Sequence, residues 1–240
     1  MYQSDKSFTA IVPVYNEEKF VIQTLKKLNF LKKNIKLEII VINDGSTDQT
    51  NELLKKNSDL YTKLLSLSVN QGKGRAVIEG LRHCSSEFVF IQDADLEYDP
   101  SDIINFIQKL EETDADLIMG SRFTSSNRSV LHFWHLLGNK IITYLFNILN
   151  NTTFTDIYCC YCLFKKEKIN MNLLKSNGWG QQAEILTFLV SGSKKIYELS
   201  VNYNARTYNE GKKIRYFNFF EVLYWILLSR LRTYINKQNQ

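Results

Sequence analysis

Short apolar runs alternate with segments of helical periodicity along the first 119 residues. The apolar runs are rich in β-branched and aromatic residues, as the buried strands of a parallel sheet are. The segments between them repeat apolar residues every three or four positions, which indicates helices that pack one face on a core. We expect strands at 8–12, 37–42, 63–69, 88–91 and 117–119, and helices at 20–31, around Leu53, around Leu81 and at 101–110. This alternation predicts an α/β fold with a mostly parallel central sheet flanked by helices.

Polar, turn-forming residues follow every one of these strands. Parallel strands bring their carboxyl ends to one edge of the sheet, where open α/β sheets bind their ligands. The pattern predicts one ligand-binding rim made of Tyr15 and Glu17, Asp44, Asn70 and Lys73, Asp93 and Asp95, and the tripeptide Gly120-Ser121-Arg122. No dinucleotide-binding glycine motif follows the first strand, and the sequence has no P-loop, so both of these nucleotide-binding classes are disfavoured.

Asp93 and Asp95 leave the end of the most apolar strand two positions apart. Two carboxylates this close repel each other unless a cation lies between them. Oxygen ligands of this kind suit Mg²⁺ or Mn²⁺ shared with a substrate phosphate. The alternative is an acidic turn in solvent in which an aspartate caps the next helix. The place of the pair in the row of polar strand ends favours the metal site.

The regular alternation stops after Arg122. We expect a polar loop at 123–130, a helix at 133–149, a short apolar segment at 156–164, a helix at 181–190 and a strand at 194–201. A last helix at 217–234 carries Phe220, Leu223, Leu227 and Leu231 on one face, beside basic and aromatic residues. That face either packs on the core or lies on an anionic membrane as an amphipathic helix.

The composition excludes several classes of function. The chain has 240 residues, 44% of them hydrophobic, and a net charge of +5 that suits attraction to phosphates. Basic and aromatic residues do not interleave before the C-terminal tail, which disfavours nucleic-acid binding. The longest uncharged apolar run, 222–228, is far short of the roughly 20 residues that span a bilayer, and the N-terminus shows no signal-peptide pattern. We expect a cytoplasmic protein, either free or peripheral on the cytoplasmic face of a membrane.

The four cysteines do not have the spacing of a zinc site. Cys159, Cys160 and Cys162 form one cluster, Cys84 stands alone, and no second ligand pair accompanies them. We interpret all four as buried thiols in a reducing compartment, with zinc binding as a remote alternative.

Five motifs in order resemble those of the family 2 glycosyltransferases, and most of all the dolichyl-phosphate mannosyltransferase-like group. They are Pro13-Val14-Tyr15-Asn16-Glu17, Asn43-Asp44-Gly45-Ser46-Thr47-Asp48, Asn70-Gln71-Gly72-Lys73-Gly74, Asp93-Ala94-Asp95 and Gly120-Ser121-Arg122. The resemblance implies a GT-A fold over 1–215, with a nucleotide-binding half at about 8–122 and an acceptor half at about 123–215. The amphipathic helix at 216–240 follows. It also implies a nucleotide-sugar donor, Mg²⁺ or Mn²⁺, and inversion at the anomeric carbon.

The resemblance also assigns roles to single positions. It places the nucleoside of the donor beside Pro13, Tyr15, Glu17 and Asp44, and the metal on Asp93 and Asp95. Lys73 is a further residue expected to bind the nucleotide sugar, and Asp93 with the metal is expected to hold its diphosphate. Arg122 matches an arginine that faces the phosphates of donor or acceptor, and Arg206 and Lys212 or Lys213 match basic residues that close over the phosphates. Asp156 and Glu184 match acidic positions on the acceptor side, where they are candidate catalytic residues together with Arg122. The structural alternative for Arg122 is an ion pair with Asp102 or Glu97.

Two kinds of acceptor are open. A lipid phosphate is already anionic and needs only positioning, whereas a sugar hydroxyl needs a base, for which Asp156 or Glu184 would serve. We expect transfer of a hexose from a UDP- or GDP-sugar to a membrane-associated acceptor such as a polyprenyl phosphate or a lipid-linked glycan. Transfer to a soluble glycan or a protein hydroxyl is the alternative, followed by an inactive scaffold that binds sugar nucleotides.

Three departures from the family pattern bear mainly on the acceptor. Asn43 replaces the first of two usual aspartates, so one carboxylate is left for the base or ribose. Glu97 stands where many relatives have glutamine, and the cysteine-rich segment 159–162 stands where a glycine is common.

Overall fold

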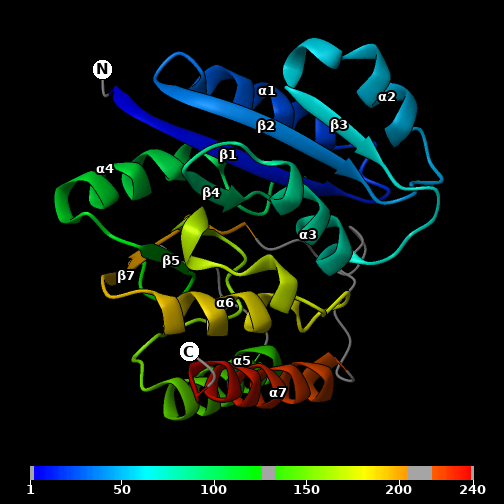
Figure 1. The fold of residues 1–240 in the computed structure, drawn as a ribbon. Helices are drawn as coiled ribbons and strands as arrows, with labels where there is room; N and C mark the ends of the chain where they lie inside the picture. The colour runs from blue at the N-terminus through cyan, green and yellow to red at the C-terminus, as the bar shows by residue number, and fades with distance from the viewer. Residues whose placement is uncertain (1–2, 126–132, 205–217, 239–240) are drawn as a thin grey trace.

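The computed structural model describes residues 3–125, 133–204 and 218–238, and its centre is one seven-stranded sheet (Figure 1). The strand order is β3-β2-β1-β4-β6-β5-β7. All neighbouring pairs are parallel except those of β6, which runs antiparallel to both β4 and β5. The strands are β1 Ser4–Val14, β2 Ile35–Asn43, β3 Lys63–Ser66, β4 Phe88–Ile91, β5 Leu117–Ser121, β6 Cys162–Lys165 and β7 Ile196–Ser200.

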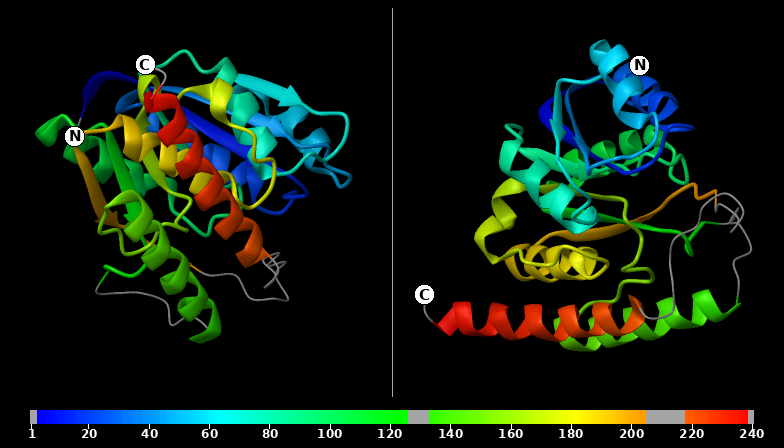
Figure 2. Two further views of the ribbon diagram at one scale, coloured as in Figure 1. Left: turned by 60° about the horizontal axis from the view of Figure 1, so that its bottom comes forward. Right: turned by 90° about the vertical axis from the view of Figure 1, so that its right-hand side faces the viewer.

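Helices cover the sheet and add an outer layer. Figure 1 shows α1 and α2 on one side of the sheet and α3 and α6 on the other. Helices α5 and α7 lie side by side beneath α6, farthest from the sheet (Figure 2). The helices are α1 Val21–Leu31, α2 Thr50–Lys56, α3 Lys73–His83, α4 Ile103–Thr113, α5 Phe133–Asn150, α6 Gln181–Gly192 and α7 Asn218–Gln238.

Strand β4 is apolar along its whole length because the sheet is covered on both faces. Its four residues, Phe88–Ile91, are each at most 1% exposed. Phe88 stacks on Phe8 of β1 with 5.6 Å between ring centroids, and burial of one such ring contributes about 1.5–3 kcal/mol. On the other side of β1, Gly80 lets α3 approach closely, because a Cβ there would lie 2.6 Å from Cγ2 of Ile11. This packing fixes the strand ends that follow.

The expected strands and helices are present with shifted limits, whereas most of the loop expected at 123–130 lies outside the described residues. Strand β1 begins at Ser4, and β3 ends at Ser66 although the apolar run continues to Val69. The apolar segment 156–164 contributes only its last part to the sheet, as the start of the reversed strand β6. None of the helices within 3–125, 133–204 and 218–238 has the length and apolar character needed to cross a bilayer.

The apolar face predicted for α7 is mostly exposed to solvent. Phe220, Leu227 and Leu231 are more than half exposed. The helix packs on α6 and α5 through a second stripe in which Val222 and Ile226 are almost fully buried. Of the expected face, only Leu223 packs against the core, and contact of the exposed residues with an anionic membrane stays a prediction.

Candidate active site

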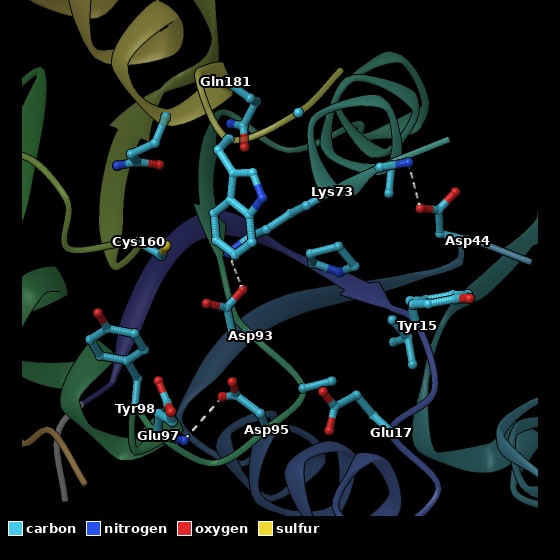
Figure 3. Close-up of a pocket in the computed structure, with 18 of the residues that line it drawn as sticks. Tyr15, Glu17, Asp44, Lys73, Asp93, Asp95, Glu97, Tyr98, Cys160 and Gln181 are labelled. Carbon is cyan, nitrogen blue, oxygen red and sulfur yellow. Dashed lines mark hydrogen bonds and ion pairs between the residues drawn. The ribbon is translucent and has the colours of Figure 1, made fainter. Parts of the chain in front are cut away.

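The polar strand ends line one pocket of about 420 Å³ (Figure 3). Among the expected site residues, those in its wall are Pro13, Tyr15, Glu17, Asp44, Lys73, Asp93, Asp95 and Arg122. They come from the end of β1, from the segments after β1, β2, β4 and β5, and from the first residue of α3. The expected rim is therefore present as one concave surface. Arg206, Lys212 and Lys213 lie outside the described residues.

Hydrogen bonds between the segments after β1 and β2 hold Tyr15 and Glu17 in place. Asn16 has a positive φ of 53°, a conformation that asparagine tolerates better than most residues. Its side chain accepts a hydrogen bond from the amide of Thr47 at 2.8 Å. The amide of Glu17 donates to Oγ1 of Thr50 at 3.0 Å. These bonds fix the backbone on either side of Tyr15, whose ring lies in the pocket wall.

Asp44 holds the next segment of the wall. Its carboxylate is 2% exposed and accepts hydrogen bonds from the amides of Gln71, at 2.8 Å, and Gly72, at 2.9 Å. Gly72 has a φ of +95°, and a Cβ there would collide with the carbonyl oxygen of Asn177. Only glycine fits this turn, which delivers Lys73 to the pocket.

The ammonium of Lys73 lies against the carboxylate of Asp93, with 2.5 Å between Nζ and Oδ1 (Figure 3). The Asp93 side chain is 17% exposed and that of Lys73 34%. Burial opposes the charge on Lys73, but the neighbouring Asp93 carboxylate more than offsets it and raises the pKa of Lys73. The neighbouring Cys160 side chain raises the pKa of Lys73 further. One expected metal ligand is thus paired with one expected phosphate ligand.

A tight turn after β4 positions Asp95 and Glu97. The buried side-chain amide of Gln92 donates to the carbonyl oxygens of Asp93 and Tyr98, both at 3.2 Å. Leu96 has a φ of 60°, a strained value for a branched residue that the surrounding bonds must maintain. Asp95 Oδ1 accepts the amide of Glu97 at 3.1 Å. The two carboxylates therefore reach the pocket from a fixed backbone.

The carboxylate oxygens of this turn fit a divalent cation that is completed by a substrate. Asp93, Asp95 and Glu97 all line the pocket. Across 3–125, 133–204 and 218–238, no group of three or more His, Cys, Asp or Glu side chains is arranged to hold a metal by itself. Mg²⁺ is usually bound by one or two carboxylates together with substrate phosphates. The oxygen-only donor set of Asp93 and Asp95 suits Mg²⁺ or Mn²⁺ of this kind.

Arg122 forms an ion pair with a different residue from those expected. Its guanidinium donates to Asp156 through Nε, at 2.7 Å to Oδ2, and Nη2, at 2.8 Å to Oδ1. Asp102 and Glu97 were the partners in the structural alternative, but both have other bonds, to Asn202 and to Tyr203 respectively. Asp156 is fully buried and is not part of the pocket wall. As placed, it orients Arg122, and its catalytic role stays a prediction.

Glu184 lies away from the pocket and anchors other segments. Its fully buried carboxylate accepts the amides of Lys175 and Ser176 at 2.9 and 2.8 Å, and Nη1 of Arg232 at 3.2 Å. Burial raises the pKa of Glu184, and the bonds from the two amides partly counter this effect. Because it does not line the pocket, its position does not support the expected catalytic role.

Sequence reasoning missed seven aromatic or polar side chains of the wall. Four are aromatic, and their aromatic character gives no hint that they line a pocket. Cys160 was expected to be a buried thiol, yet it is only partly buried and faces Lys73, whereas Cys84, Cys159 and Cys162 are buried. The missed residues are Tyr98, Tyr158, Cys160, Trp179, Gln181, Gln182 and Tyr203.

Asn43, one of the departures from the family pattern, does not reach the pocket. It is 3% exposed. Its side chain bonds to Asn51 at 3.2 Å and accepts the amide of Ser46 at 3.0 Å. The residue closes the turn after β2 through these side-chain bonds and is not part of the pocket wall.

Two curated relatives are dolichyl-phosphate beta-glucosyltransferases of Trichomonas vaginalis. One is 28% identical over 225 residues, which cover 85% of this chain and 67% of the relative. The other is 30% identical over 211 residues, which cover 81% of this chain and 64% of the relative. The chain thus spans about two thirds of the length of these relatives.

Solved structures with the same fold include two glycosyl-transfer proteins. Glucosyl-3-phosphoglycerate synthase from Mycobacterium tuberculosis, in complex with Mn²⁺, UDP and phosphoglyceric acid, has a TM-score of 0.67 at 17% identity. The match covers 94% of this chain and 79% of that one. S. aureus TarS in complex with UDP has a TM-score of 0.59 at 19% identity, covering 93% and 65%. These likenesses confirm the expected GT-A fold.

The sequence model of glycosyl transferase family 2 matches residues 9–171. This match spans more than half of the chain, and it includes every strand end of the pocket from Tyr15 to Arg122. The chain therefore belongs to glycosyl transferase family 2 and is a glycosyltransferase.

Proposed function

We propose that the protein transfers a hexose from a UDP- or GDP-sugar to the phosphate of a membrane lipid such as a polyprenyl phosphate. The observation that carries the proposal is the arrangement of the pocket wall. Tyr15, Asp44, Asp93 and Asp95 line one pocket, Lys73 pairs there with Asp93, and Arg122 brings a second cationic side chain to the same wall. This combination suits a nucleoside diphosphate.

The donor is bound by complementary groups along the rim. The ring of Tyr15 offers a face for stacking a base. Glu17 and Asp44 offer carboxylate oxygens, which accept hydrogen bonds from ribose hydroxyls. Lys73 and Arg122 supply positive charge for the diphosphate, and arginine can engage phosphate oxygens with two parallel hydrogen bonds. A divalent cation on Asp93 and Asp95 would neutralise the negative charge that develops on the leaving nucleotide.

The position of the acidic residues favours a phosphate acceptor. The two carboxylates expected to act as a base are used elsewhere, Asp156 by Arg122 and Glu184 by backbone amides and Arg232. A phosphate oxygen needs no base. It forms the bond to the anomeric carbon while the bond from that carbon to the nucleotide diphosphate breaks, so the configuration inverts and no proton moves. The curated relatives are named for a lipid phosphate of this class.

An exposed apolar surface supports the membrane part of the proposal. We call it the α5–α7 face, because it lies on α5 and α7, the helices farthest from the sheet in Figure 2. A patch of large apolar groups on a soluble surface marks a site of contact with a membrane or a protein. Lys140 and Arg230 on the same helices favour an anionic lipid surface. The α5–α7 face consists of Phe133, Trp134, Leu137, Ile141, Tyr144, Ile148, Phe220, Tyr224, Leu227, Leu231, Tyr234 and Ile235.

Transfer from labelled UDP-glucose and GDP-mannose to a polyprenyl phosphate in detergent tests the proposal. We expect activity with one donor in Mn²⁺ or Mg²⁺ and none after EDTA. Because a metal contributes several kcal/mol to the stabilisation of the leaving charge, Asp95→Asn is expected to lower kcat/KM about 100-fold or more. NMR of the product is expected to show the anomeric configuration inverted.

Asp99→Asn is the matched control, because Asp99 lies on the same segment but pairs with Lys27 at 2.6 Å. It is expected to keep kcat/KM within about threefold, as exposed ion pairs contribute little. If no nucleotide sugar is bound or consumed, and Asp95→Asn changes nothing, the enzyme is not the proposed transferase. Transfer to phosphoglyceric acid or a soluble glycan, with none to the lipid, would instead overturn the choice of acceptor.

A further inference from the structure

Lys73 occupies a position that normally disfavours a cation. It is the first residue of α3, and the N-terminus of a helix carries a partial positive charge. The side chain nevertheless reaches back to Asp93, with Nζ 2.5 Å from Oδ1. The first turn of this helix contains no acidic residue that could pair with Lys73. The carboxylate of Asp93, from the end of β4, therefore holds the ammonium in the pocket.

The same oxygen is suited to a divalent cation. Metal–oxygen distances for Mg²⁺ are about 2.0–2.1 Å, so a cation on Oδ1 of Asp93 would take the place of the ammonium. The second carboxylate oxygen does not remove the conflict, because two positive charges on one carboxylate repel each other. The pair is partly buried, with 17% of Asp93 exposed, and such charges are screened less than surface charges.

We propose that Lys73 competes with the divalent cation for Asp93, so that the cation binds tightly only together with a nucleotide diphosphate. The diphosphate offers the ammonium a second anionic partner and offers the cation further oxygen ligands. Lys73 thus exchanges Asp93 for a donor phosphate when the cation binds. This inference rests on the proposed function, since it assumes that the pocket takes a nucleoside diphosphate.

The competition is measured by binding of Mn²⁺ to the full-length chain, from the EPR signal of free Mn²⁺. Titrations are made with Mn²⁺ alone and with saturating UDP or GDP, after correction for Mn²⁺ that the nucleotide binds in solution. In the wild type we expect the nucleotide to raise the affinity for Mn²⁺. Lys73→Met and Lys73→Gln are expected to raise the affinity for Mn²⁺ alone about tenfold or more, because the competing charge is removed.

Lys27→Met is the matched control. It removes a lysine from the ion pair with Asp99, 2.6 Å long and on the same segment as Asp93, and is expected to leave the affinity for Mn²⁺ unchanged. Asp93→Asn is expected to lower the affinity in both the wild type and the Lys73→Met background, which places the gained cation at this site.

Unchanged or weaker binding of Mn²⁺ alone in both folded Lys73 variants would overturn the inference. That result is distinguishable from failure of the proposed function, because the wild type would still consume a nucleotide sugar in the transfer assay. If the wild type consumes no donor and binds Mn²⁺ neither alone nor with nucleotide, both the inference and the proposed function are wrong.

Discussion

A single carboxylate, that of Asp44, links two strand ends of the pocket. Each of its oxygens accepts one backbone amide from the segment after β3. A carboxylate has about four lone-pair sites, so this use leaves acceptor capacity for a ribose hydroxyl. Asn43 beside it makes the turn and takes no part in the wall. In this chain, Asp44 is therefore the residue of the 43–44 pair that lines the pocket.

Residue pairs that are distant in the sequence could not be predicted. Arg122 and Asp156 were both selected, yet for separate roles, since nothing local relates positions 34 apart. Their bidentate pair depends on how β5 and the segment before β6 meet. Glu184 was recognised as a glutamate in an apolar stretch, but its satisfaction by two amides of a preceding loop cannot be read from helical periodicity.

Cys160 is expected to react with alkylating agents only as the pH rises. Burial raises the pKa of its thiol, and the neighbouring Lys73 lowers it, for a net value of about 11. The neutral thiol is favoured below that pH, and the thiolate is the nucleophile. Its rate of alkylation by iodoacetamide, followed by peptide mass spectrometry, should rise about tenfold per pH unit between pH 7 and 10.

Cys159 is an internal control for this measurement, because it is buried and should stay unmodified while the protein is folded. UDP with Mn²⁺ should slow the reaction of Cys160, which lines the pocket. A rate that levels off near pH 8.5, the range of an ordinary thiol, would contradict the predicted pKa.

At the scale of elements, the sequence pattern predicted the strands and helices of the first half well. Apolar runs and the turn residues that end them are local signals, and the pocket is made mainly of such ends. The faces of α5 and α7 were not predictable in the same way. Their exposed sides are as apolar as their buried sides, so periodicity cannot tell which one packs on α6. Nor does the apolar run that ends at Phe164 indicate that β6 is reversed.

Helix α7 is fixed to the core through Arg232 and Glu184. Arg232 donates to the buried carboxylate at 3.2 Å and also lies over the ring of Trp225, 5.5 Å from its centroid. Trp225 packs against Gly180, where a Cβ would collide with its ring. The N-terminal end of α6, next to the pocket residues Trp179 and Gln181, is therefore in contact with α7.

Arg232→Met is expected to lower the free energy of unfolding by about 1–3 kcal/mol at pH 7, because it leaves a buried carboxylate without its cation. Burial already raises the pKa of Glu184, and loss of Arg232 raises it further. In the folded variant, Glu184 is then protonated at a higher pH than in the wild type. The loss of stability should therefore be largest above the folded pKa and shrink as the pH falls toward 4.

Urea unfolding at pH 7 and pH 4 measures both effects. Arg230→Met, on the same helix, is the control and should change the free energy of unfolding by less than about 0.5 kcal/mol. An equal loss at both pH values for Arg232→Met would show that packing on Trp225, and not the charge on Glu184, accounts for the contribution of Arg232.

At the scale of the whole molecule, the α5–α7 face is expected to bind anionic vesicles. Leu227 and Leu231 are 58% and 55% exposed, so replacing both with glutamate adds negative charge without opening the core. We expect the double variant to bind vesicles containing phosphatidylglycerol about tenfold more weakly in a sedimentation assay. Binding by the wild type should weaken as salt is raised.

Phe30→Glu is the control, because Phe30 is 59% exposed but lies on α1. It should bind vesicles as the wild type does. Wild-type affinity in the double variant would remove α7 from the contact. A wild type that ignores vesicles and instead forms a dimer, lost in the double variant, would show that the face joins two copies of the chain.

The direction of β6 has a consequence for how acceptor preference can diverge on this scaffold. β6 runs antiparallel to β4 and β5, so it begins at the edge of the sheet where those two strands end. Tyr158 and Cys160, which precede β6, therefore line the pocket. Residues after it lie at the opposite edge, where the amide of Lys166 bonds to Glu87. Insertions at 166–168 would lie away from the pocket, whereas exchanges of Tyr158 and Cys160 would alter its wall without changing β1 and β2. If the proposed function holds, acceptor preference can change through these two positions while β1 and β2 stay constant.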